Sequence, residues 1–153
     1  NVPGNGQNQA LFSKDHSGYK DGGHLTIFLD GAGRVKVRYQ DEDSQEYLGS
    51  SEKVVAGEDY HVSFTFDENG TKLYLNGELV DEGEGWDGGM TGNEEDIAVG
   101  ASTQTRNGDN DNLQWHFNGE ITNGLLLDRP MHGYELYQQI QAGKLDLPPQ
   151  LPA

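Results

Sequence analysis

Cysteine is absent from the sequence, basic residues are few, and no long apolar run occurs. The missing cysteines exclude disulfides, zinc–thiolate sites and cysteine nucleophiles. Ten Lys and Arg face 26 Asp and Glu, a net charge of −16 that argues against nucleic acid and anionic membrane surfaces as partners. No stretch approaches the ~20 apolar residues that cross a bilayer, so we expect no membrane insertion.

Glycine, acidic residues and short alternating apolar runs are what the chain does contain. Its 153 residues suit one domain, and 22 glycines favour many turns over helices. Only 33% of the residues are hydrophobic, but they are grouped in short runs, which indicates a folded domain with an acidic surface. Such a surface suits a saline environment or hard cations such as calcium.

Period-two alternation predicts the strands. In Arg34–Tyr39 three basic side chains alternate with Val35, Val37 and Tyr39, a pattern that a helix would not produce. Asn76-Gly77 is a strong two-residue hairpin signal. Many short strands separated by turns are typical of a sandwich or barrel. The expected strands are Leu11–Lys14, His24–Asp30, Arg34–Tyr39, Tyr60–Phe66, Lys72–Leu75, Glu78–Asp81, Ile97–Ala101, Leu113–Phe117 and Ile121–Leu127.

One helical pattern follows Pro130, over roughly Gly133–Ala142, and Gly143 is its expected stop. The tail LDLPPQLPA holds three prolines in its last six residues and reads as a linker. We therefore expect a domain over residues 1–143 and a linker over residues 144–153.

Seven segments in order resemble the bacterial laminin-G-like domains of the concanavalin-A-like superfamily. The resemblance implies an all-β, two-sheet antiparallel jelly-roll sandwich with one short C-terminal helix, within a larger secreted or cell-surface protein. That fold hosts lectins, adhesion modules, sialidase accessory domains and hydrolases, so it says little about function. The segments are LFSKD (Leu11–Asp15), LDGAGRVKV (Leu29–Val37), DYHVSFTFD (Asp59–Asp67), KLYLNGELV (Lys72–Val80), IAVGAS (Ile97–Ser102), FNGEI (Phe117–Ile121) and LDRPMHGYEL (Leu127–Leu136).

The start of the chain departs from that family. One or two strands usually precede the LFSKD segment, whereas here only nine loop-like residues do. A sheet that lacks a strand exposes unpaired backbone groups, which proteins normally cover or pair. We therefore expect a second chain or a missing segment to complete the sheet.

A catalytic role is disfavoured by the carboxylates. Sugar-cleaving relatives carry paired acids spaced E-x-D-x-x-E on a strand, and the nearest match is Asp41–Glu46. It follows a strand end and reads as a solvated hairpin tip, where acids are neither fixed in a cleft nor shifted in pKa. The histidines show no zinc spacing. We expect no glycosidase or lyase activity.

Three long, glycine-rich acidic loops carry the candidate ligand-binding residues: Asp15–Gly23, Glu82–Asp96 and Ser102–Asn112. A glycan site combines an aromatic platform with polar side chains. For both tryptophans the alternative is a place in the core. Trp86 suits the core as well as the loop rim. Trp115 lies two residues before Phe117, so on a strand the two side chains share a face. The candidates are Tyr19, Trp86, Arg106, Asn107, Trp115 and His116.

A calcium site is the cofactor prediction. Asp109, Asn110 and Asp111 belong to a run of oxygen-bearing side chains, and the resemblance allows a metal at this rim, with Asp15 and Asp21 as further ligands. The alternative is an acidic loop that no ligand orders.

The favoured function is a non-catalytic module that binds a glycan or cell-surface polysaccharide, or mediates adhesion. The other readings are a structural spacer and, least supported, a glycosidase or lyase.

Overall fold

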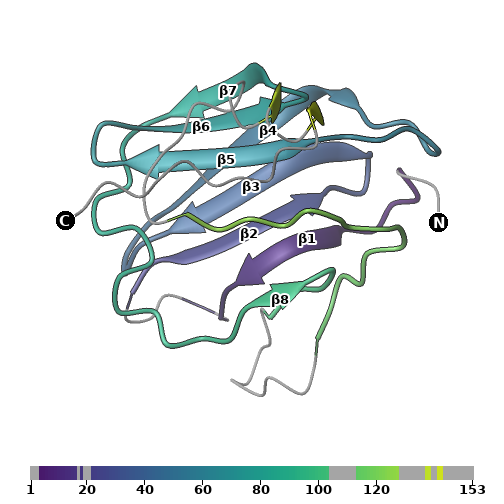
Figure 1. Ribbon diagram of the computed structural model, residues 1–153. Coiled ribbons are helices and arrows are strands. Elements are labelled where there is room, and N and C mark those ends of the chain that lie inside the picture. Colours follow the sequence, from purple (N-terminus) through teal and green to yellow (C-terminus); the bar gives the residue numbers. More distant parts are fainter. Residues whose placement is uncertain are drawn as a thin grey trace.

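The computed structural model describes residues 4–16, 18, 22–103, 113–127, 137–138 and 141–142. Within these ranges the chain forms two antiparallel sheets, of order β4-β3-β2-β1-β8 and β5-β6-β7. They face each other as a sandwich, which confirms the predicted all-β fold (Figure 1). The strands are β1 Gln9–Lys14, β2 His24–Leu29, β3 Arg34–Gln40, β4 Gln45–Lys53, β5 Val62–Asp67, β6 Gly70–Leu75, β7 Glu78–Gly83 and β8 Ala98–Val99.

Side-chain caps and left-handed residues form the hairpins. Between β2 and β3, Asp30 Oδ1 accepts hydrogen bonds from the backbone N–H groups of Ala32 and Arg34, both at 2.9 Å. Between β6 and β7, Asn76 and Gly77 both have positive φ, 52° and 80°, as the predicted two-residue turn requires. These turns fix the strand register, and the register decides which side chains share a face.

The hydrophobic core fills the space between the sheets. The inner side chains of β2 and β3 pack there against Leu73 of β6. Trp86, from the loop after β7, joins them, with its ring centroid 5.4 Å from that of Tyr39 and 4.7 Å from that of Phe66. The buried members of the cluster are Leu25, Leu29, Val35, Val37, Tyr39, Leu48, Leu73 and Trp86.

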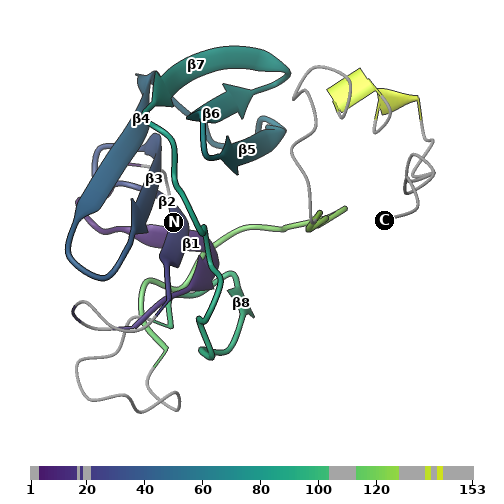
Figure 2. The same cartoon turned by 90° about the vertical axis from the view of Figure 1, so that its left-hand side faces the viewer.

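The segment between β7 and β8 runs across one end of the sandwich (Figure 2). Asn93 fastens it to the large sheet, since its Nδ2 donates to the carbonyls of Lys14, at 3.1 Å, and Gly23, at 2.7 Å. Gly23 fits only because it has no side chain: a Cβ there would lie 1.9 Å from the Gly89 carbonyl oxygen. This end of the molecule is therefore tightly closed around the core.

Three elements differ from the sequence predictions. β4 was not expected, because its nine residues contain only two large apolar side chains. The expected strand Leu113–Phe117 is reduced to one bridge, Ser102 with Gln114, and Ile121–Leu127 is no strand. Of the expected helix, Tyr137, Gln138 and Gln141 are helical, and its start lies outside the described residues.

The two long edges of the sandwich differ. On one, β7 lies against β4, and Gly49 N donates to Asp81 Oδ2 at 2.8 Å. On the other, β5 has no further strand beside it within the described ranges. The extended segment 118–127 lies in the layer of the small sheet (Figures 1 and 2), with Ile121, Leu125 and Leu126 exposed. A second chain or segment that completes the sheet stays a prediction.

Candidate functional site

The described parts of the three loops singled out in the sequence meet at one rim. Asn93, from the second loop, binds carbonyls at both ends of the first. Asp15 N donates to Thr103 Oγ1 and that hydroxyl donates to Asp15 O, both at 2.9 Å, so the first and third loops also start side by side. The residues beyond Thr103, up to residue 112, lie outside the described part of the chain.

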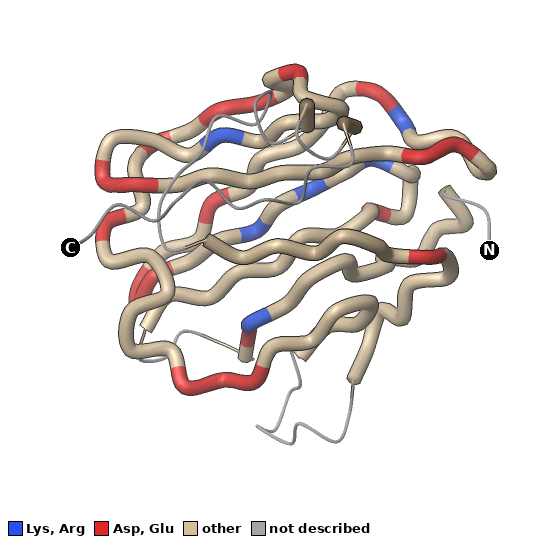
Figure 3. Tube along the Cα trace, viewed as in Figure 1, with Lys and Arg blue, Asp and Glu red and all other residues tan. Residues whose placement is uncertain are grey.

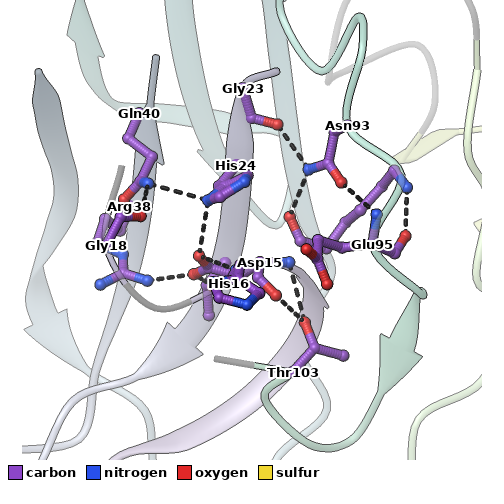
Figure 4. A network of polar contacts seen from close by, with 12 residues as sticks. Asp15, His16, Gly18, Gly23, His24, Arg38, Gln40, Asn93, Glu95 and Thr103 are labelled. Carbon is purple, nitrogen blue, oxygen red and sulfur yellow. Dashed lines mark hydrogen bonds and ion pairs between the residues drawn. The ribbon is translucent and has the colours of Figure 1, made fainter. Parts of the chain in front are cut away.

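A buried polar network lies below this rim, on the outer face of the large sheet (Figure 4). Its centre is Asp15, whose side chain is fully buried. Asp15 Oδ2 accepts from Thr26 Oγ1 at 2.5 Å and forms an ion pair with Arg38 Nη2. Asp15 Oδ1 accepts from the backbone N–H of His16 at 2.8 Å.

His24 links the network to β3. Its Nδ1 lies 3.5 Å from Asp15 Oδ1 and 2.9 Å from Gln40 Nε2. Gln40 Nε2 also donates to the carbonyl of Gly18 at 2.9 Å, which holds the first loop over the sheet. The network therefore joins the central strands to the beginning of that loop.

The ionisation of Asp15 follows from these contacts. Burial raises the pKa of this carboxyl, but the hydrogen bond with His24 and the positive charge of Arg38 outweigh it, together with the hydrogen bonds from Thr26 and Arg38. The pKa of Asp15 is lowered as a result, so the group is an anion at neutral pH. Its oxygens already hold donors, and Arg38 already balances its charge.

This geometry bears on the predicted calcium site. Asp15 is engaged with Arg38 and Thr26, which makes it a poor metal ligand as placed here. Asp21, Asp109, Asn110 and Asp111 lie outside the described residues. Within the described ranges, no group of three or more His, Asp or Glu side chains is arranged to hold a metal ion. The calcium site stays a prediction.

Trp115 lies on the outer face of the sheet, not in the core. Its ring packs on Phe28 with centroids 5.3 Å apart, and its carbonyl accepts from Ala10 N at 2.7 Å. Its φ of 52° is unusual for a bulky residue and breaks the strand alternation. Phe117, two residues on, therefore packs on the core while Trp115 stays half-exposed and His116 exposed. The expectation that both aromatics share a face is wrong.

Trp86 follows the core alternative. It is only 4% exposed, and its backbone N–H donates to the carbonyl of Asp67 at 2.9 Å. An open depression of about 450 Å³ lies beside it, with Asp67, Glu68 and Asp87 on its walls. Trp86 is thus no exposed stacking platform. Tyr19, Arg106 and Asn107, the other candidates, lie outside the described residues.

Sequence reasoning missed one aromatic side chain of the outer face. Tyr47 of β4 is 52% exposed and pairs with Arg38, so it shares the face that holds Trp115. The strand β4 itself was not expected, which is why Tyr47 was not weighed. The alternating bases of β3 point to the same face, and their spacing was the sequence signal that could have identified this face as a binding surface.

In the part of the chain that the structure describes, no helix has the length and apolar character that a membrane span needs. A comparison with curated protein sequences found no match.

Solved structures with similar folds include a carbohydrate-binding module of family 40 from the Ruminococcus gnavus IT-sialidase, which has been solved bound to α2,3-sialyllactose. The identity is 19%, the TM-score 0.53, and the match covers 77% of this chain and 66% of that one. A domain of an S-layer domain-containing protein from Clostridium thermocellum matches at 20% identity and TM-score 0.47, over 87% of this chain and 63% of that one. This chain thus spans less than two thirds of either.

A family model decides the classification. The model for the concanavalin A-like lectin/glucanases superfamily matches residues 1–135, which is most of the chain. The two-sheet topology agrees with that assignment. The protein therefore belongs to the concanavalin A-like lectin/glucanase superfamily.

Proposed function

We propose that this chain is a non-catalytic carbohydrate-binding module that presents the outer face of its five-stranded sheet to a glycan. The observation that carries the proposal is the pair of aromatic side chains on that face, the half-exposed Trp115 and the exposed Tyr47. Aromatic rings stack on sugar rings, and polar groups around them fix orientation. The similar fold of a sialidase carbohydrate-binding module supports the same function.

The acids of β3–β4 support a role without catalysis. Asp41 and Asp43 lie exposed in the hairpin turn, where Asp41 Oδ1 accepts from the N–H groups of Asp43 and Ser44. Slight burial raises the pKa of Asp41, but its hydrogen bonds with Ser44 and Asp43 lower it overall. A general acid for glycoside cleavage needs a raised pKa in a cleft. The hydrogen bonds of Asp41 therefore stabilise the hairpin turn, and its lowered pKa does not suit a general acid.

A place outside the cell follows from the proposal, since polysaccharides are found at cell surfaces and in secretions.

We also propose that calcium orders the rim through Asp21, Asp109, Asn110 and Asp111. A ligand that binds only the folded state stabilises it. Millimolar calcium should then raise the melting temperature more than sodium at equal ionic strength, and Asp109→Asn with Asp111→Asn should remove the difference. Equal effects of the two salts would remove calcium from the proposal.

Glycan-array screening followed by calorimetric titration tests the function. We expect Trp115→Ala and Tyr47→Ala each to weaken binding by about tenfold, the scale of one aromatic contact. Leu79→Ala, an exposed apolar residue of β7 on the other sheet, is the matched control and should bind normally. Absence of binding to every glycan would leave the spacer alternative, and release of reducing sugar would overturn the non-catalytic assignment.

A further inference from the structure

Positive charge is concentrated on one face of this acidic protein. Arg34, Lys36 and Arg38 of β3 alternate with core residues, so all three lie on the outer face of the large sheet. Lys53 of β4 pairs directly with Arg34 and joins them. The described part of the chain holds six Lys and Arg, and four of them are therefore on this face.

Within the described residues, no acid pairs directly with these bases across the strands. β4 does carry two acids: Glu46 pairs with the inner residue Tyr39, and Glu52 precedes Lys53 in the sequence. The outer side chains of β2 and β4 beside these bases are Thr26, Phe28 and Tyr47, with Gly49 opposite Lys36. Among the described acids, Asp15 contacts this face, and it forms an ion pair with Arg38. Asp30, in the adjoining turn, caps backbone N–H groups. Figure 3 shows acids on the loops, on the hairpins and along β7, while the bases of β3 lie along the middle of the large sheet.

Lys36 is the best placed of these cations. A Cβ at Gly49 would lie 2.5 Å from Lys36 Cδ, so the lysine stem lies flat over the bare backbone of β4. Lys36 also pairs with Phe28, on whose other side Trp115 packs. Within the described residues, Lys36, Arg34 and Lys53 form no ion pair with an acid. Three cations on a face with two aromatic platforms are thus left for a ligand.

We propose that this face selects glycans that carry an anionic group, a carboxylate or a sulfate, with Lys36 as the main contact. The inference rests on the proposed function and names its substrate class. A net charge of −16 repels densely charged polyanions such as nucleic acid. A sugar chain with spaced charges instead meets a local positive strip, and its rings meet Tyr47 and Trp115. Neutral sugars gain only the ring contacts.

Titration of three polysaccharide classes, neutral, uronate-bearing and sulfated, tests the inference with Lys36→Gln, Gly49→Ala and the control Lys72→Gln. Lys72 is exposed on β6, in the other sheet. We expect Lys36→Gln to weaken binding of the anionic class about tenfold and to reduce its salt dependence. Gly49→Ala keeps the charge but displaces the lysine stem, and should act in the same direction. Lys72→Gln should change nothing, and thermal unfolding checks that each variant folds.

The outcomes separate this inference from the function on which it rests. Preference for uronate or for sulfate, lost with Lys36→Gln, supports the proposal and identifies the group. Equal binding of neutral and anionic sugars, or equal effects of the Lys36 and Lys72 variants, overturns the anionic selectivity while leaving a carbohydrate-binding module. Failure to bind any of the three classes counts against both.

Discussion

Around Thr26 and Arg38, both faces of the five-stranded sheet are buried, but different interactions bury them. On the inner face, Val35 and Val37 are fully buried among other apolar side chains. On the outer face, Ser13, Thr26 and Asp15 are fully buried too, and each of them is hydrogen-bonded. Apolar packing has no direction, whereas each polar contact needs a particular partner at a particular angle.

The two faces should therefore respond differently to substitutions. On the inner face the cost of a substitution follows the volume removed, because a cavity is left behind. On the outer face it follows the number of buried groups that lose a partner. Substitutions of similar size should therefore have different signatures on the two faces, in pH dependence and in local protection.

Trp86→Ala should have the largest effect. The indole packs on Tyr39 and Phe66 on the inner side, so its removal should lower the free energy of unfolding by about 4 kcal/mol. Urea denaturation measures this, with Leu79→Ala as the control for loss of an exposed apolar side chain. A Trp86→Ala protein that keeps its stability would place Trp86 outside the core and weaken the contrast between the faces.

Asp15→Asn should come next, at about 3 kcal/mol at pH 7, because Arg38 is left as a buried charge without its partner. The pKa of Asp15 is lowered in the fold, so its contribution is present above the unfolded pKa of 3.8 and lost as the pH falls through the folded pKa. The stability curves of the wild type and the variant should therefore converge in acid. A constant gap from pH 7 to pH 2 would show that the charge of Asp15 contributes nothing.

Thr103→Val should have the smallest effect, about 1 kcal/mol, since it removes a hydroxyl bonded to Asp15 and Ser13 while keeping the shape. Amide exchange at Asp15 should speed up. Thr71→Val is the matched control: this fully buried threonine bonds Tyr39 Oη at 3.0 Å on the inner side. It should cost about as much without changing exchange at Asp15. Unchanged exchange in both variants would mean that Thr103 does not tie the loops together.

Regular alternation and turn chemistry made most of the strands predictable. The bases of β3 and the Asn76-Gly77 turn specify their local structure almost alone. β4 was missed because most of its residues are polar and exposed, so no apolar alternation marks it, although it pairs with the neighbouring strand β3. The expected shared face of Trp115 and Phe117 failed because a single left-handed residue reverses the parity that follows it.

The site was less predictable than the fold. Asp15 was expected to bind a metal, and nothing near it in the sequence announces the arginine, threonine and histidine that surround it in space. Trp86 lies in a polar, glycine-rich loop, a context that suggests exposure. That loop closes the end of the sandwich, so its two large apolar side chains, Trp86 and Met90, turn inward.

Within the described ranges β5 has a free edge, and this edge affects the behaviour of the protein in solution. An exposed strand edge beside apolar side chains such as Leu125 and Leu126 is a template for pairing between copies. The net charge of −16 opposes that encounter through mutual repulsion. The acidity of the surface thus protects this strand edge from association between copies. Neutralising carboxylates in acid, or screening them with salt, should shift the protein from monomers towards edge-to-edge assemblies.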